Sequence, residues 1–188
     1  EFVAFDQPIL PWSDINLWMS VFNPFKVLCV IREPGDQIAE FVKRGILYNP
    51  FRSPFLNYAQ VNVLSIYGNS HKSMLKFHID ALQGRLARID EMIDTIPQER
   101  LLVVDFEGLA MKYEYYKSKI ENFLGICSDS HQSKKKYYDP VVASENSVDI
   151  YKNIPERTRK ILEEDDDLKK SIQQLRKWYG NRIKDIRD

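Results

Sequence analysis

The sequence lacks the features that mark disulfide-rich, membrane-spanning or nucleic-acid-binding proteins. Among 188 residues there are two cysteines, Cys29 and Cys127, too few for a disulfide framework or a four-cysteine zinc site. No apolar run approaches the ~20 residues that span a bilayer, and no signal peptide is visible. Lys plus Arg and Asp plus Glu both total 27, so the basic excess of nucleic-acid binders is missing. We therefore expect no integral membrane segment, no nucleic-acid partner and a cytoplasmic location.

Glycine and histidine are also scarce. None of the seven glycines lies in a Gly-x-x-x-x-Gly-Lys-Ser/Thr loop, the usual cradle for nucleotide phosphates. The histidines His71, His78 and His131 do not have the spacing of metal ligands, so we expect no metal. His78 has two interpretations, a base on the acceptor side of an active site or a histidine of the core or surface.

The residues that are present predict one folded domain. Hydrophobic residues make up 44% and aromatic residues 12%, which excludes a disordered chain. The chain opens without methionine on an apolar run at 2–6, so we expect an N-terminally incomplete domain over 1–188. Residues 155–188 are predicted to form its C-terminal helical segment.

Three short apolar runs are typical of buried strands. They cover residues 2–6, 27–31 and 101–105, and none alternates with polar residues. Helical patterns lie between them, which predicts an α/β fold with a parallel sheet and crossover helices. The expected helices cover about 13–22, 35–45, 71–95, 111–124, a short segment after Pro155, and 167–186. The stretches 46–60 and 128–136 are predicted to be loops.

The longest helix, about 71–95, carries an apolar stripe. Its members recur at steps of three and four: Leu75, Ile79, Leu82, Leu86, Ile89, Ile93 and Ile96. The stripe fits either a face that packs into the core or a surface for pairing with another helix.

Polar residues end all three predicted strands: Asp6, Arg32 and Asp105. Ligands of open parallel sheets bind at the carboxyl ends of the strands. Arg32 also precedes the N-terminus of a predicted helix, with Asp36 as its expected N-cap, and this combination favours an anion such as phosphate. The competing interpretation is an ion pair with Glu33 or Asp36.

Three segments resemble sulfotransferases of the bacterial type that use 3′-phosphoadenosine-5′-phosphosulfate (PAPS). Residues 27–40, Val-Leu-Cys-Val-Ile-Arg-Glu-Pro-Gly-Asp-Gln-Ile-Ala-Glu, resemble the family's strand, Arg-Asp-Pro-x-Asp and helix. Residues 100–125 resemble its strand ending in Tyr-Glu-Asp-Leu and a helix closing with Phe-Leu-Gly. Residues 138–152 resemble its late loop. The resemblance implies a three-layer α/β fold with a P-loop-like parallel sheet flanked by helices.

The resemblance also implies roles for single residues. Arg32 matches the arginine that binds the 3′-phosphate of the nucleotide. Glu40 stands where the family has a serine that binds the same phosphate. A carboxylate cannot donate to a phosphate, so this departure either weakens the site or passes the donor role to Lys43 or Arg44. Phe106 matches an adenine-binding tyrosine without its hydroxyl.

Further site residues come from the late loop and the first strand. Ser144, Asn146 and Lys152 lie in the segment that closes over the nucleotide in relatives, so one or two of them are expected at the 3′-phosphate. Asp6 lies near the family's catalytic base and is the candidate base here, with a structural strand-end aspartate as the alternative. The family's 5′-phosphosulfate loop is missing and is expected upstream of Glu1.

The predicted function is therefore transfer of a sulfuryl group from PAPS to a hydroxyl or amine, leaving 3′-phosphoadenosine-5′-phosphate (PAP). The acceptor is expected to be a small molecule or a carbohydrate. Two alternatives remain open. One is a P-loop kinase-like phosphotransferase, which shares the sheet. The other is a non-catalytic interaction domain with a decayed nucleotide site, whose surface would be the apolar stripe of residues 75–96.

Overall fold

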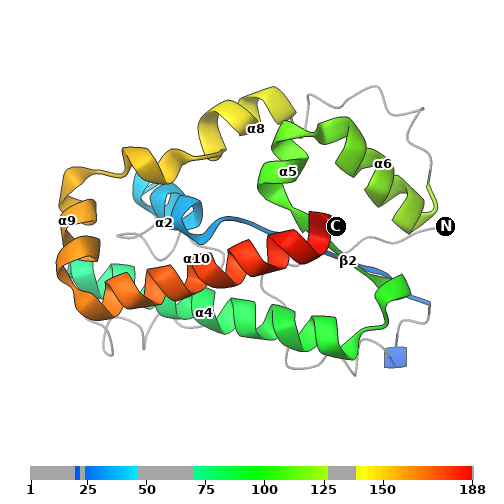
Figure 1. Ribbon diagram of the computed structural model, residues 1–188, viewed down its shortest axis with the longest axis horizontal. Helices are drawn as coiled ribbons and strands as arrows, with labels where there is room; N and C mark the ends of the chain where they lie inside the picture. Colours follow the sequence, from blue (N-terminus) through cyan, green and yellow to red (C-terminus); the bar gives the residue numbers. More distant parts are fainter. Residues whose placement is uncertain (1–19, 22–23, 46–69, 127–138, 188) are drawn as a thin grey trace.

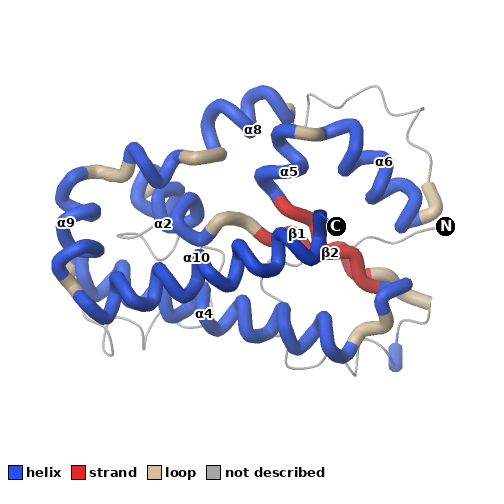
Figure 2. The backbone as a smooth tube through the Cα atoms, in the orientation of Figure 1, coloured by secondary structure: helices blue, strands red, loops and turns tan. Residues whose placement is uncertain are grey.

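The computed structural model describes residues 20–21, 24–45, 70–126 and 139–187 (Figure 1). This part of the chain is mostly helical, and its helices flank a pair of strands (Figure 2), one face of which leaves Leu28 and Val30 of β1 exposed. The elements in chain order are β1 (Val27–Ile31), α2 (Pro34–Lys43), α4 (His71–Thr95), the 3₁₀ helix η3 (Gln98–Arg100), β2 (Leu101–Asp105), α5 (Phe106–Met111), α6 (Tyr113–Leu124), α8 (Pro140–Ser147), the 3₁₀ helix η4 (Ile150–Asn153), α9 (Glu156–Glu164) and α10 (Asp166–Arg187).

The two strands are parallel and in register from Val27 opposite Leu101 to Ile31 opposite Asp105. Both agree with the strands predicted from the apolar runs. Because they are parallel, their carboxyl ends meet at one edge of the sheet, with α2 and α5 starting there. The described part is thus α/β in the coarse sense. The predicted strand 2–6, the loops 46–60 and 128–136, and most of the predicted helix 13–22 lie outside the described residues.

The apolar stripe of α4 is buried. The helix begins after the cap Ser70, whose Oγ accepts from the backbone N–H of Ser73, and it ends just before Pro97. Leu75 and Ile79 are fully buried, and the stripe packs into one core with residues of β1, α2 and α10. The prediction of a core-facing stripe is confirmed, so the interaction-domain alternative loses the exposed surface on which it depended.

The last helix, α10, is an integral part of this core. It runs beside α4 in the same direction (Figure 1) and contacts α2 and β2 as well. Its buried face consists of Leu168, Ile172, Leu175 and Ile183. Near its middle, Trp178 donates to Asp90 of α4 at 2.8 Å. The described residues 155–187 of the predicted helical segment therefore supply one wall of the core.

Two helix predictions need correction. The predicted helix 111–124 begins only at Tyr113, because Lys112 leaves helical geometry at φ −129° and ψ 49° and a separate α5 precedes it. Gly125 ends α6 in the left-handed conformation at φ 70°, which glycine adopts without a side-chain clash. The N-cap of α2 is Glu33 rather than Asp36, since the Glu33 carboxylate accepts from the backbone N–H of Asp36.

The described part of the late segment, residues 139–152, contains α8 and most of η4 instead of the predicted loop. Asp139 caps α8 by accepting from the N–H of Val141, and Pro140 at the first helical position has its backbone preset for a helix. After a left-handed Asp149 at φ 60° the chain forms η4. Ser144 and Asn146 therefore lie on a helix, and Lys152 lies on a 3₁₀ turn.

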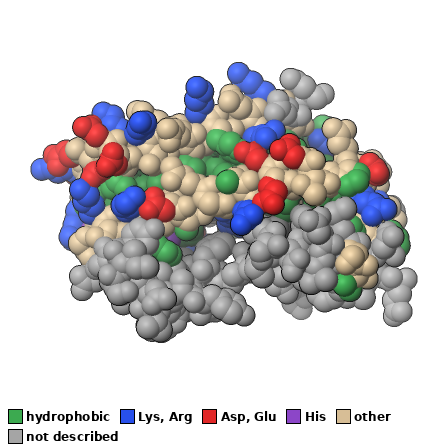
Figure 3. Space-filling view, turned by 90° about the horizontal axis from the view of Figure 1, so that it is seen from below, with side chains coloured by type: hydrophobic (Ala, Val, Ile, Leu, Met, Phe, Trp, Pro, Cys, Tyr) green, Lys and Arg blue, Asp and Glu red, His purple; other side chains and the backbone are tan. Residues whose placement is uncertain are grey.

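The described surface carries both charge signs. On the face shown in Figure 3, Lys and Arg side chains are interspersed with Asp and Glu side chains. Across residues 20–21, 24–45, 70–126 and 139–187, no helix has the length and apolar character needed to cross a bilayer.

Candidate functional site

The carboxyl edge of the sheet brings together three segments that are far apart in sequence. Arg32 follows β1 directly, and its guanidinium lies 4.9 Å from the ring centroid of Phe106, which follows β2. The Nη2 of Arg32 donates to the backbone carbonyl of Ser147, at the end of α8, at 2.5 Å. We call the set of Arg32, Glu40, Phe106, Glu107 and the Ser147 carbonyl the Arg32 site.

Two carboxylates lie near the Arg32 guanidinium but beyond hydrogen-bond distance of it. Glu40 Oε2 lies 3.9 Å from Arg32 Nη2, and Glu107 Oε1 lies 3.9 Å from Arg32 Nε. Both distances exceed hydrogen-bond range, and within the described residues Arg32 Nε is buried with no hydrogen-bond partner. A buried donor without a partner is costly, so this N–H is available to an acceptor that enters the site.

The two carboxylate oxygens of Glu40 face different arginines. Its Oε1 accepts from Arg44 Nε, one turn further along α2, while its Oε2 faces Arg32. The serine of the resembling family is thus replaced by a carboxylate whose charge Arg44 partly offsets. Lys43, the other expected donor, instead reaches the backbone carbonyl of Asn146 at 3.3 Å.

Behind Arg32 lies a buried chain of hydrogen-bonding oxygens. The Tyr179 hydroxyl of α10 is 2.6 Å from Asp105 Oδ1 and 2.6 Å from Glu107 Oε2. Asp105 Oδ2 accepts from the backbone N–H of Gly108, and Glu107 Oε1 accepts from the N–H of Glu33. The pKa of Glu107 is raised to about 7, mainly by burial; the interaction with the Asp105 carboxyl also raises it, whereas hydrogen bonds with Tyr179 and with backbone N–H groups lower it. Burial and the two neighbouring carboxyls also raise the pKa of Tyr179, so it stays a phenol.

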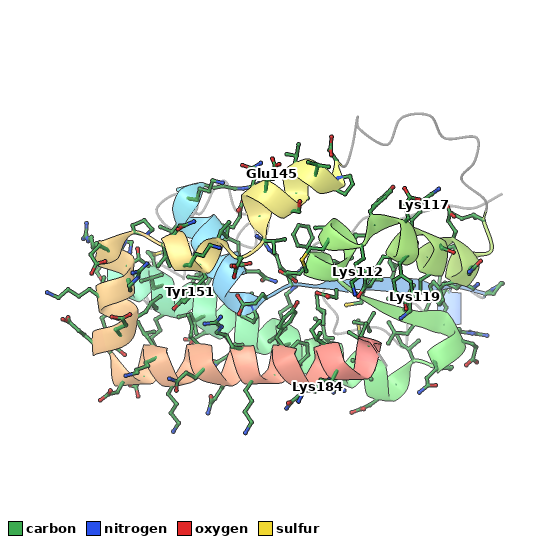
Figure 4. All side chains as sticks on the ribbon, turned by 45° about the horizontal axis from the view of Figure 1, so that its top comes forward. Lys112, Lys117, Lys119, Glu145, Tyr151 and Lys184 are labelled. Carbon is green, nitrogen blue, oxygen red and sulfur yellow. The ribbon has the colours of Figure 1, made fainter. Side chains whose placement is uncertain are left out.

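Asp36 ties the late segment to α2. Its Oδ2 accepts from the N–H of Asp149 at 2.6 Å, and its Oδ1 accepts from the N–H of Tyr151 at 2.8 Å. The Tyr151 ring lies beside α2 (Figure 4), where a Cβ on Gly35 would come within 3.0 Å of it. The guanidinium of Arg176 in α10 lies over the Tyr151 ring, 5.0 Å from its centroid. These contacts fix the end of α8 and η4 next to Arg32.

The predicted late-segment residues are not at the guanidinium. Ser144 Oγ donates to the carbonyl of Val141 within α8, and Asn146 Nδ2 donates to the carbonyl of Val142. Lys152 is exposed and pairs with Asp149 at 2.9 Å. Ser147 reaches Arg32 instead, through its backbone. The candidate base Asp6 lies outside the described residues.

The remaining candidates belong to the core. His78 is 2% exposed and packs against Phe41 with ring centroids 4.8 Å apart, and burial lowers its pKa to about 4. His71 is buried and shares a hydrogen bond with Thr158. Cys29 is buried in β1, where burial raises the pKa of its thiol to about 11. In the described ranges no cluster of three or more His, Cys, Asp or Glu is placed to hold a metal ion.

Sequence reasoning missed Glu107, Tyr179 and Ser147. Glu107 carried a signal, because it lies two residues after the end of β2. Tyr179 fits the apolar face of α10 and is indistinguishable there from a core residue. Ser147 acts through its carbonyl, for which no side-chain pattern exists.

Comparison of the chain with family models, curated proteins and solved structures finds no match.

Proposed function

We propose that this protein is a PAPS-dependent sulfotransferase in which Arg32 binds the 3′-phosphate of the nucleotide. The observation that supports the proposal is the guanidinium at the carboxyl end of β1, beside the start of α2, with a buried Nε–H that has no protein partner in the described residues. A guanidinium with an unused donor at a strand end suits a phosphate. The proposal includes the finer architecture, a three-layer domain with a larger P-loop-like parallel sheet.

A second line of support is the meeting of the three segments that resemble the family. Arg32 contacts Phe106, 74 residues away, and the Ser147 carbonyl, 115 residues away, and Glu33 contacts Glu107 across 74 residues. In this proposal Phe106 lies near the adenine, and the segment from Ser144 to Lys152 covers the nucleotide. Its helical form leaves the Ser147 carbonyl and the α8 end as the parts closest to Arg32.

The proposed chemistry is an in-line sulfuryl transfer. The acceptor oxygen or nitrogen forms a bond to sulfur while the bond from sulfur to the 5′-phosphate oxygen breaks, and PAP leaves. A base takes the acceptor proton, and Asp6 remains the candidate for it. Cationic groups offset charge on the leaving phosphate. The acceptor is proposed to be a carbohydrate or other small hydroxyl or amine compound, and the location cytoplasmic.

The test is thermal unfolding of the natural polypeptide that contains these residues, with PAP or with ADP. PAP at ~100 times its dissociation constant stabilises by about 2.7 kcal/mol, a rise of about 5–10 °C in Tm for this size. ADP lacks a 3′-phosphate and should produce a much smaller rise. Equal rises with both nucleotides, or none with either, would contradict the proposal.

A pair of variants connects binding to the site. Arg32→Gln removes the charge-assisted contact and should weaken PAP binding about 10- to 100-fold. Arg88→Gln is the matched control, because Arg88 lies exposed on α4 and pairs with Glu91. It should bind PAP like the wild type. Equal affinity of the two variants for PAP would show that Arg32 does not bind the nucleotide.

A further inference from the structure

The cluster of Asp105, Tyr179 and Glu107 needs one proton more than a neutral tyrosine and two ionised carboxylates carry. Two oxygen–oxygen contacts of 2.6 Å flank the Tyr179 hydroxyl, and each requires a hydrogen. The hydroxyl has one hydrogen. One carboxyl must therefore be protonated, because two ionised carboxylates would leave one of these contacts repulsive.

We assign that proton to Glu107, because burial raises the pKa of its carboxyl to about 7. Each of the two carboxyls also accepts one backbone N–H, Asp105 Oδ2 from Gly108 and Glu107 Oε1 from Glu33. Glu107 Oε2 then donates to Tyr179, and Tyr179 donates to Asp105. Each donor in this series of hydrogen bonds then has one acceptor.

Glu107 also faces Arg32, so its proton sets the charge at the proposed phosphate site. The groups around it are Arg32 after β1, the Glu33 backbone at the start of α2, Asp105 of β2 and Tyr179 of α10. Glu40 of α2 and Arg176 of α10 face its neighbours Arg32 and Glu33. A neutral Glu107 leaves the Arg32 charge to an incoming anion, whereas an ionised Glu107 offsets it and repels phosphate.

We propose that Glu107 is a positioning residue that holds a proton in the folded protein near neutral pH, and that its ionisation weakens phosphate binding at Arg32. The part that concerns phosphate rests on the proposed function. The raised pKa of Glu107, about 7, places this change in the neutral range. If only the protonated form binds, apparent affinity falls about tenfold from pH 6 to pH 8.

The first experiment needs no ligand. The ¹³C chemical shift of the Glu107 side-chain carboxyl is followed in the wild-type protein from pH 4 to pH 9, with Glu107→Gln assigning the signal. The proposal predicts a midpoint near pH 7. A midpoint below about 5, in the range of an ordinary glutamate, would overturn it.

The second experiment compares the dissociation constants of PAP for the wild type and Glu107→Gln at pH 6 and pH 8. Glutamine has the shape of the neutral carboxyl, so its oxygen accepts from Glu33 and its amide donates to Tyr179. The ratio of the two constants cancels titration of the nucleotide and of other buried groups such as His78. The wild type should match the variant at pH 6 and bind about tenfold more weakly at pH 8.

The outcomes separate the two proposals. A ratio that does not change with pH, with PAP bound by both proteins, would overturn the role of Glu107 and leave the sulfotransferase proposal standing. A carboxyl midpoint near 7 without PAP binding to either protein would support the proton on Glu107 and refute the phosphate site. Glu164→Gln, on the exposed end of α9, is the control and should follow the wild type at both pH values.

Discussion

Replacing Asp36 by asparagine tests how the late segment is held against α2. Asp36 is 3% exposed, and each of its carboxylate oxygens accepts one backbone N–H, from Asp149 and from Tyr151. Asparagine keeps one acceptor oxygen and places an NH₂ group where the other was. One backbone N–H then faces another donor and loses its partner.

The expected cost follows from these two contacts. A hydrogen bond to a charged group contributes about 1.5–3 kcal/mol, so we expect Asp36→Asn to lower the free energy of unfolding by about 2 kcal/mol. For a chain of 188 residues this lowers Tm by about 4–8 °C. Because η4 and the end of α8 lie next to Arg32, the substitution should also weaken PAP binding.

The assay is urea denaturation followed by circular dichroism, with Glu164→Gln as the matched control. Glu164 is 67% exposed and pairs with Lys160 on the surface, so its substitution should change stability by less than about 0.5 kcal/mol. A cost for Asp36→Asn as small as that of the control would refute the reasoning that Asp36 anchors the late segment.

Three further predictions concern the core and its pH dependence. Gly108→Ala should destabilise the protein by at least about 2 kcal/mol in urea denaturation, because the new Cβ would collide with Tyr116. Gly84→Ala is the matched control on α4, where the new Cβ meets open space, and it should stabilise the protein by about 0.5–1 kcal/mol. Equal effects would argue against the packing around α5. Ile79→Ala removes a fully buried side chain and should cost about 2–5 kcal/mol in the same assay; a cost below 1 kcal/mol would mean the α4 stripe is not core. The unfolded state protonates His78 near pH 6.5 and the folded state only near pH 4, so wild-type stability should fall as pH drops through this window more than that of His78→Leu. Parallel melting-temperature profiles would refute this.

Local patterns in the sequence were sufficient to predict most of the described elements. The apolar runs at 27–31 and 101–104 form strands, so both strand predictions are confirmed, although Leu28 and Val30 on one face of β1 are exposed rather than buried. The seven-residue recurrence along α4 and the left-handed Gly125 are equally local features, set by helix geometry and by the lack of a side chain. The late segment is the exception, since residues 140–147 form a helix after the cap Asp139 where a loop was predicted.

The candidate site could be predicted only in part. Arg32 was found because its signal is local, a cation between an apolar strand and a helix start. Its partners depend on packing between distant segments: Tyr179 reaches Glu107 across 72 residues, and Ser147 reaches Arg32 across 115 residues. A protonated carboxyl has no sequence signature, since the burial and the neighbours that raise its pKa exist only in the folded chain.

The most direct test of the account is a crystal structure of the natural polypeptide with PAP bound. The account predicts a 3′-phosphate oxygen within about 3 Å of the Arg32 guanidinium, with the adenine beside Phe106. A nucleotide bound elsewhere, or one whose 3′-phosphate lies away from Arg32 while Arg32 keeps only its protein contacts, would contradict the central claim.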